Sequence, residues 1–410
     1  METQKERQSP PHPRSTLKST LENDSPQPVI PVDRTGISHI HIIAFDLPYP
    51  PDYGGATDIF HKIRSLHDLG IKITLHVFLY KGKMPAPALE ALTEKTHYYY
   101  RRRWVNPFFG SMPYVVTTRN SEQLLRNLLL DEHPILFEGL HTTAYLNRPE
   151  LKHRTMVVRA HNVEHNYYRA LGEAERRWIK QKFFFLESNR LQIYEPILKQ
   201  AHAIAAISPM ETAYFQKTYG NAHYVPAFHS NSKVMSLPGK GNYVLYHGNL
   251  SIPENDRAAI YLVNEVFPLL SQPCIVAGSN PSQMLQNAAA KYPHIQIKAN
   301  LTAEEIFDLV RNAHVNTLVT FQSTGIKLKL LNALYRGRHI VANTPMVEET
   351  QLESLCRVSD DPKTMAHIIK QCFLESFELA DIQAREQHLL NTFNNAANAE
   401  KLMALFEPTI

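Results

Sequence analysis

The chain has 410 residues, of which 43% are hydrophobic and 20% charged, so it can build large cores and is too long for one typical domain. Its formal net charge of +4 is small for this length and gives no reason to expect a nucleic-acid partner. Three cysteines without paired spacing, and no apolar run of membrane-spanning or signal-peptide type, indicate a cytoplasmic protein.

The first 36 residues are rich in proline, serine and charge, as in Ser9-Pro10-Pro11-His12-Pro13. Such a composition cannot bury enough apolar surface to offset the entropy lost on ordering. Residues 1–36 are therefore predicted to form a disordered tail.

The ordered chain begins with an apolar strand at residues 39–45. After a short loop, Gly54 and Gly55 lead into a helix that ends near Gly70, and residues 71–80 form the next strand. Strand, glycine turn, helix and strand make one parallel α/β unit. The two glycines permit close approach of a ligand to the backbone at the strand's carboxyl end, although a loop can also need them for its shape alone.

Residues 98–104 join three tyrosines and a tryptophan to three arginines. Such a cluster could meet lipid head groups, an acidic acceptor or RNA. The commoner case is a strand end followed by a solvated charge run, and this interpretation is favoured here.

The rest of the first half repeats the alternation of helices and strands. Glu138 leaves one short strand, and His161-Asn162-Val163-Glu164-His165 leaves the next. A helical region to about residue 200 and a strand at 203–207 come next, before a helix that the capping box of Ser208 and Glu211 begins. Residues 37–228 are predicted to form one domain, and the polar segment 229–242 a linker.

The second half shows the same alternation more clearly. Strands are predicted at 243–246, 274–278, 295–297, 315–321 and 355–358, with helices at 254–270, 281–291 and 302–313, and two long helices toward the end. The predicted fold class is therefore α/β, with two Rossmann-like, doubly wound parallel-sheet domains facing a cleft. Residues 243–380 form the second domain, and residues 381–410 a helix that packs back toward the first.

An anion site is predicted where the strand at 315–321 turns at Gly325 into a helix that ends at Gly337. Free N–H groups and the positive end of the helix dipole favour an anion there, and Lys327 and Lys329 add cationic side chains. A phosphate or diphosphate fits such a place. The alternative is that both glycines delimit an ordinary helix with solvated lysines.

Taken together, these features resemble the GT-B glycosyltransferases, and in particular the retaining, nucleotide-sugar-using group known as family 4-like or group 1. The resemblance rests on the Gly54-Gly55 loop, His161 after a strand, the turn Gly248-Asn249-Leu250-Ser251-Ile252-Pro253-Glu254-Asn255, and the segment from Gly325 to Gly337. It covers about residues 38–375.

The resemblance implies that the second domain holds the nucleotide sugar and the first presents the acceptor. Lys329 would neutralise the diphosphate and His161 would face the transferred sugar. The donor-side residues it implies are Gly248, Asn249, Asn255, Thr324, Gly325, Lys327 and Asn332. The acceptor-side residues it implies are Gly54, Gly55, Glu138 and Glu164.

The sequence departs from the family pattern at three positions. Two glutamates eight positions apart are common in that group, and Thr324 and Asn332 stand there. Asn249 replaces a basic residue often found after the turn glycine. An asparagine can hydrogen-bond a ribose, but more weakly than a carboxylate.

The predicted function is transfer of a sugar, of hexosyl type, from a nucleotide-sugar donor to a glycan or lipid-linked acceptor. Retention, independence of metals and the absence of a cofactor beyond the co-substrate are expected. We further expect no nucleic-acid partner, and peripheral contact with the inner membrane face. The alternatives are a catalytically silent sugar-nucleotide-binding scaffold of a polysaccharide assembly complex and, remotely, a zinc peptidase using His161, Glu164 and His165.

Overall fold

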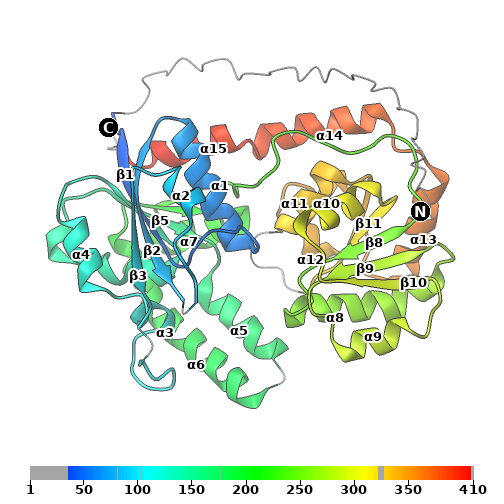
Figure 1. Ribbon diagram of the computed structural model, residues 1–410, viewed down its shortest axis with the longest axis horizontal. Coiled ribbons are helices and arrows are strands. Elements are labelled where there is room, and N and C mark those ends of the chain that lie inside the picture. Colours follow the sequence, from blue (N-terminus) through cyan, green and yellow to red (C-terminus); the bar gives the residue numbers. More distant parts are fainter. Residues whose placement is uncertain (1–35, 81, 103, 176, 322–326, 408–410) are drawn as a thin grey trace, which may run out of the picture. The chain divides into compact units, whose positions relative to one another are not determined.

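The computed structural model describes residues 36–80, 82–102, 104–175, 177–321 and 327–407. Within these ranges the chain forms two all-parallel sheets, each with helices on both faces (Figure 1). The predicted α/β class with two Rossmann-like domains is thereby confirmed. The predicted site residues Thr324 and Gly325 lie outside the described residues.

The first sheet has seven strands in the order β3-β2-β1-β4-β5-β6-β7. The strands are β1 (His39–Ala44), β2 (Lys72–Leu79), β3 (Lys95–Tyr100), β4 (Ile135–Glu138), β5 (Met156–Ala160), β6 (Ala203–Ala206) and β7 (Ala222–Tyr224). In register, Ile42 of β1 lies opposite Leu75 on one side and Leu136 on the other. The strand order reverses between β1 and β4, which is where open parallel sheets form ligand sites.

The helices of the first domain cover both faces of this sheet. They are α1 (Gly54–Asp68), α2 (Pro87–Glu90), α3 (Tyr114–Thr117), α4 (Glu122–Leu128), α5 (Glu164–Ala174), α6 (Trp178–Tyr194) and α7 (Pro209–Tyr219). Buried side chains of α1 and α2 pack on one face, whereas those of α3, α4 and α7 pack on the other. Helices α5 and α6 form a hairpin that starts where β5 ends (Figure 1).

The second sheet has six strands in the order β10-β9-β8-β11-β12-β13. The strands are β8 (Val244–His247), β9 (Cys274–Gly278), β10 (Ile295–Ala299), β11 (Val315–Leu318), β12 (His339–Ala342) and β13 (Arg357–Val358). The order reverses between β8 and β11, so the second domain repeats the architecture of the first. The carboxyl ends of β8 and β11 therefore lie side by side.

The helices of the second domain are also divided between two faces (Figure 1). They are α8 (Pro253–Tyr261), α9 (Gln283–Ala289), α10 (Ala303–Asn312), α11 (Leu328–Arg336), α12 (Thr344–Val347) and α13 (Pro362–Leu374). The capping box predicted at the start of α10 is present, with Thr302 and Glu305 each accepting a hydrogen bond from the other's backbone N–H.

The predicted single helix at 254–270 is wrong in its second half. Helix α8 ends at Tyr261, and the chain continues as a π-helical turn, Leu262–Val266, and a 3-10 turn, Phe267–Leu269. Pro268 explains the change, because proline has no N–H to donate and its ring clashes with the carbonyl four residues earlier.

Three helices, rather than the predicted two, end the described chain: α13, α14 (Leu379–Thr392) and α15 (Asn395–Ala404). The break after α14 occurs where Asn394 caps α15 by accepting a hydrogen bond from the N–H of Ala397. Leu389 of α14 packs in the core of the second domain, whereas Leu402 of α15 packs in the core that contains α1.

The chain thus passes twice between the domains, once after β7 and once between α14 and α15. The two passages are hydrogen-bonded to each other. The His229 ring Nε2 lies 2.8 Å from the carbonyl oxygen of Phe393, and the Asn395 amide donates to the carbonyl of His229 at 2.7 Å.

Candidate active site

The turn between β8 and α8 is one wall of the candidate site. Gly248 continues the strand by donating its N–H to the carbonyl of Ala277 at 3.0 Å. Gly278, at the end of the neighbouring strand, lies so close that a Cβ on it would come within 1.9 Å of the Gly248 oxygen. A side chain at Gly278 is therefore excluded, and the backbone of the turn is held in one place.

Asn255 and Lys329 meet behind this turn. The Lys329 ammonium donates to the Asn255 side-chain oxygen at 3.0 Å and lies 5.5 Å from the centre of the Tyr246 ring. The Tyr246 hydroxyl in turn donates to the backbone carbonyl of Asn255 at 2.9 Å. A predicted donor-side residue and the lysine predicted to neutralise the diphosphate are thus brought together at the carboxyl end of the sheet.

Burial, followed by the nearby ammonium of Lys327, lowers the pKa of Lys329 to about 8, while the carboxylate of Glu254 acts in the opposite direction. The Lys329 ammonium is held by a neutral amide rather than by a carboxylate. An anionic ligand at this place would therefore relieve an existing electrostatic cost.

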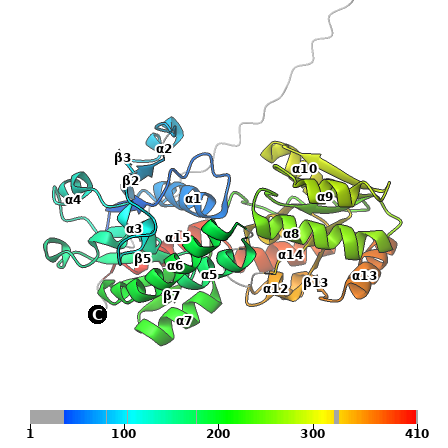
Figure 2. The same cartoon turned by 90° about the horizontal axis from the view of Figure 1, so that it is seen from below.

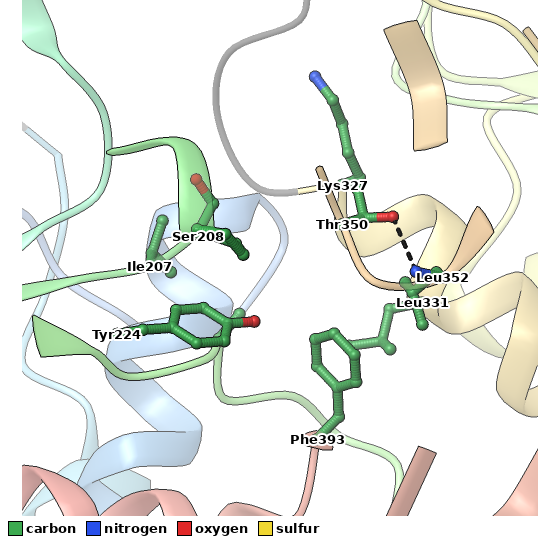
Figure 3. Close-up of a pocket in the computed structure, with 10 residues that line it drawn as sticks. Ile207, Ser208, Tyr224, Lys327, Leu331, Thr350, Leu352 and Phe393 are labelled. Atoms are coloured by element: carbon green, nitrogen blue, oxygen red, sulfur yellow. Dashed lines mark hydrogen bonds between the residues drawn. The ribbon is translucent and has the colours of Figure 1, made fainter. Parts of the chain in front are cut away.

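Lys327 borders a cavity of about 50 Å³ between the two domains (Figure 3). The figure shows Tyr224 and Ser208 facing Leu331 and Phe393, with the Lys327 amine directed away from both rings. Burial lowers the pKa of Lys327 to about 8, against the raising effect of the Glu211 and Glu254 carboxylates.

Two residues at this site were missed from the sequence. Glu254 joins the two strand ends, because its carboxylate accepts from the Thr320 hydroxyl at 2.9 Å and from the Phe321 N–H at 2.6 Å. His247 ends β8, and burial, followed by the charge of Lys329, lowers its pKa to about 4. The one feature of the sequence that could have indicated Glu254 and His247 is their position on either side of the glycine turn.

Asn332 and Asn249 are largely engaged by their own neighbours. The Asn332 oxygen accepts from the amide of Asn231 at 2.8 Å, and Asn231 also accepts from Arg336. The Asn249 oxygen accepts from the Ser251 hydroxyl at 2.6 Å. Both asparagines thus shape the segments beside the site.

Gly54 and Gly55 begin α1 and lie opposite the second domain. A Cβ on Gly54 would contact the Leu328 side chain at 3.8 Å, so the starts of α1 and α11 approach closely. A Cβ on Gly55 would come within 2.9 Å of the Phe45 ring, which leaves no room for a side chain there. The predicted glycine loop and the lysine-bearing helix are therefore neighbours.

His161 lies at the end of β5 and belongs to a buried charged network. Its Nε2 lies 2.9 Å from one oxygen of Glu138, and the Lys62 ammonium lies 2.7 Å from the other. Burial opposes ionisation of Glu138, but Lys62 and His161 hold the pKa of this carboxyl below its usual value. The carboxylate therefore stays ionised and accepts a hydrogen bond from His161 Nε2–H, and Glu138 is buried behind His161 rather than open to an acceptor.

Among the described residues, the one group with the spacing of metal ligands is Asp58, Glu138 and His161. Lys62 lies within it, 2.9 Å from Asp58, and Arg159 donates to the same carboxylate at 2.9 Å. The two cations balance both carboxylates, so this group does not suit a divalent ion.

Glu164 and His165 diverge from His161 instead of forming a shared site. Glu164 is buried at the start of α5, and burial raises its pKa to about 8 despite a hydrogen bond from Asn162. The His165 ring bonds to Glu195 at 3.0 Å, whereas that of His161 bonds to Glu138. The two histidines of the zinc-peptidase motif therefore have different partners.

Residues 241–374, which contain the donor-side turn and both lysines, match the family model of the glycosyl transferases group 1. The second domain is a group 1 glycosyltransferase domain. The protein is accordingly a glycosyltransferase, and the predicted enzyme class is confirmed. A protein from Klebsiella pneumoniae, described as an uncharacterized 44.6 kDa protein in the cps region, is 24% identical over 353 residues, covering 81% of this chain and 90% of its own.

Solved structures show the same fold at low sequence identity. A variant of S. aureus TarM in complex with Fondaparinux, alpha-GlcNAc-glycerol and UDP has a TM-score of 0.62 at 10% identity, over 91% of this glycosyltransferase and 100% of that chain. Anabaena HepE in complex with UDP and glucose has a TM-score of 0.60 at 10% identity, covering 90% of this chain and 98% of that chain. A UDP-forming trehalose-phosphate synthase from Burkholderia xenovorans has a TM-score of 0.59 at 10% identity, covering 90% of this chain and 100% of that chain.

None of the helices in the described part of the glycosyltransferase has the length and apolar character that crossing a membrane requires.

Proposed function

We propose that this glycosyltransferase moves a sugar from a nucleoside-diphosphate sugar to a glycan or lipid-linked acceptor, with retention of configuration and without a metal ion. The observation that carries the proposal is the partly buried Lys329 ammonium, held by Asn255 beside the glycine turn. A diphosphate placed there would accept hydrogen bonds from the backbone N–H groups of the turn, and the two lysines would neutralise its charge.

The comparisons support a uridine diphosphate sugar and a polysaccharide product. TarM and HepE were solved with UDP, and the trehalose-phosphate synthase is described as UDP-forming. The relative from Klebsiella pneumoniae is described by its place in the cps region.

The reaction follows from where charge develops. When the bond between the sugar and the diphosphate breaks, negative charge grows on the diphosphate oxygens, and Lys327 and Lys329 stabilise that charge more than they stabilise the ground state. The acceptor oxygen bonds to the sugar carbon on the face that the diphosphate leaves, and its proton passes to the departing phosphate. His161 lies beside the transferred sugar, and its buried Nδ1 has no hydrogen-bond partner among the described residues.

The two lysines supply the positive charge that a divalent ion would otherwise contribute, which is the reason for proposing metal independence. Transfer that persists after EDTA treatment supports this part of the proposal, and transfer restored only by added Mg²⁺ or Mn²⁺ refutes it.

A silent binding scaffold remains the second candidate, because the Asn332 oxygen is already taken up by Asn231. The experiment that separates the two is a thermal-shift screen with UDP-, GDP- and ADP-sugars, followed by an assay of donor hydrolysis and transfer. Stabilisation with turnover supports the enzyme, whereas stabilisation without hydrolysis or transfer supports the scaffold. Lys329→Gln should abolish the stabilisation, and Lys291→Gln, in the exposed turn after α9, is the matched control.

A further inference from the structure

A cavity of about 400 Å³ lies between the tip of the α5–α6 hairpin and the β8–α8 turn, which approach each other in both views (Figures 1 and 2). The hairpin contributes the apolar side chains of Leu171 and Phe184, and the turn contributes Ser251 and Pro253. This volume lies within the usual range for small-ligand sites of about 300–1,000 Å³.

The cavity is continuous with the donor-side turn. Glu254, which lines it, directly precedes Asn255, the residue that holds Lys329. Ser251, which also lines it, donates its hydroxyl to Asn249. A molecule in this cavity would therefore lie next to the donor-side turn and between the two domains.

Two cations and two carboxylates line the cavity, and the cations are the groups that can bind an anion. Arg177 and Lys180 line it, and neither forms an ion pair with a carboxylate in the part of the chain that the structure describes. The two carboxylates of the cavity are engaged: Glu175 accepts from the backbone N–H of Arg177, and Glu254 accepts from Thr320 and Phe321. The cations remain available to a ligand.

An exposed apolar surface adjoins these cations. Trp178 and Ile179 lie between Arg177 and Lys180 in the chain and are 64% and 53% exposed. Ile179 lies one helical turn before Phe183, whose ring contacts that of Phe108 at 6.4 Å between centroids. The surface therefore extends toward the loop that carries the 99% exposed Trp104.

We propose that the tip of the α5–α6 hairpin recognises the acceptor, and that this acceptor is a saccharide joined through phosphate or diphosphate to a lipid chain. The saccharide occupies the cavity, Arg177 and Lys180 bind the phosphate, and Trp178 and Ile179 contact the lipid chain. This inference rests on the proposed function, and it selects the lipid-linked acceptor over a free glycan.

The test uses the fact that the chain has two tryptophans, Trp104 and Trp178. In a Trp104→Phe variant, all tryptophan emission reports on the hairpin tip. Farnesyl diphosphate is titrated into this variant below its micelle concentration, with UDP present to fill the donor site. A saturable blue shift is expected, since the indole leaves water when the chain binds.

Variants locate the binding. Arg177→Gln combined with Lys180→Gln should weaken farnesyl diphosphate by about 10- to 100-fold, the effect of losing charge-assisted hydrogen bonds. Lys329→Gln and Lys291→Gln should leave it unchanged. Loss of binding in Lys329→Gln would place the probe in the donor site and overturn the inference. Farnesol binding as tightly as its diphosphate would do the same.

Two further measurements distinguish binding of an acceptor from binding of a membrane surface and from binding in the donor site. An equal blue shift with phosphatidylglycerol vesicles that Arg177 and Lys180 do not affect would assign the surface to the bilayer and not to an acceptor. UDP binding is measured independently by thermal shift. If UDP binds and farnesyl diphosphate does not, the inference fails while the donor assignment stands. The reverse result would refute the donor assignment, and with it the role of the bound molecule as an acceptor.

Discussion

The Nε2 atom of His161 lies 2.9 Å from Oε2 of Glu138 at the ends of two neighbouring strands. This bond places the ring proton on Nε2 and leaves Nδ1 as a buried acceptor of hydrogen bonds. The orientation of His161 therefore depends on a carboxylate that is itself held by Lys62, 76 positions away in the chain.

Replacing Glu138 by glutamine tests this dependence. We expect transfer to fall by up to about 100-fold while UDP affinity is kept, because the ring would lose its fixed proton position. The loss of one buried charge should also reduce the free energy of unfolding by about 3 kcal/mol. Nitrogen chemical shifts of the His161 ring, measured by NMR, should change with the variant.

The chain offers a matched control for this variant. Glu132 and His153 form an exposed pair of the same kind in the same domain. Glu132→Gln should change the free energy of unfolding by less than about 0.5 kcal/mol and leave turnover intact. If Glu138→Gln kept full turnover and an unchanged ring spectrum, Glu138 would have no positioning role.

Donor binding should depend on pH in alkaline solution. The pKa values of Lys327 and Lys329 are lowered to about 8, so both side chains lose their charge as the pH rises through this value. The dissociation constant for UDP, measured by calorimetry, should be steady below pH 7 and increase above pH 8. Lys329→Gln should bind UDP more weakly at every pH and show a smaller increase, and a wild-type affinity that stays constant to pH 9 would count against the lysine site.

Gly278→Ala should disrupt the donor-side turn, because the new Cβ would overlap the Gly248 oxygen. We expect a loss of about 1–3 kcal/mol in the free energy of unfolding and a marked loss of UDP binding, read from urea denaturation and thermal shift. Gly36→Ala is the control, since a Cβ there would have no neighbour within 4 Å. Normal UDP binding by Gly278→Ala would show that the close approach of the two strands is unimportant.

Lowering the pH from 6.5 toward 4 should reduce the free energy of unfolding, at pH values where most carboxylates are still ionised. Burial lowers the pKa values of His41, His61, His229, His247 and His339 to about 4. An imidazole whose pKa is lower in the folded state binds protons preferentially in the unfolded state, so stability is full above pH 6.5 and declines as the pH falls toward 4.

Urea denaturation at pH 7, 6 and 5 checks this decline, and His61→Gln should make it shallower. His367→Gln, at an exposed position, should leave the slope as in the wild type. A midpoint that does not change between pH 7 and pH 5 would contradict the assignment of these imidazoles as neutral.

The architecture was readable from the sequence because strands of parallel sheets are apolar and their turns need glycine. The same signals located Lys329 and Asn255, which the structure brings within 3.0 Å. The prediction of one helix over 254–270 was wrong because Pro268 interrupts it, and this single residue lies inside an otherwise apolar helical pattern.

Contacts between residues far apart in the sequence could not be predicted from the sequence. Lys62 lies in an amphipathic helix, where a lysine normally indicates a solvated position, yet it is fully buried between Asp58 and Glu138. The pairing of Asn332 with Asn231 likewise joins residues about 100 positions apart, and no local pattern signals it. Glu254 looked like an ordinary first-turn acid, although it connects two strand ends.

The paired chain passages at His229 and Phe393 have a consequence for motion. Two connections that are bonded to each other should restrict the domains more than one linker would, and we expect them to act as the axis of any rotation between the domains, near the ring of His229. Opening and closing about this axis would widen or narrow the gap between Gly54 and Leu328, and with it the entrance for both substrates.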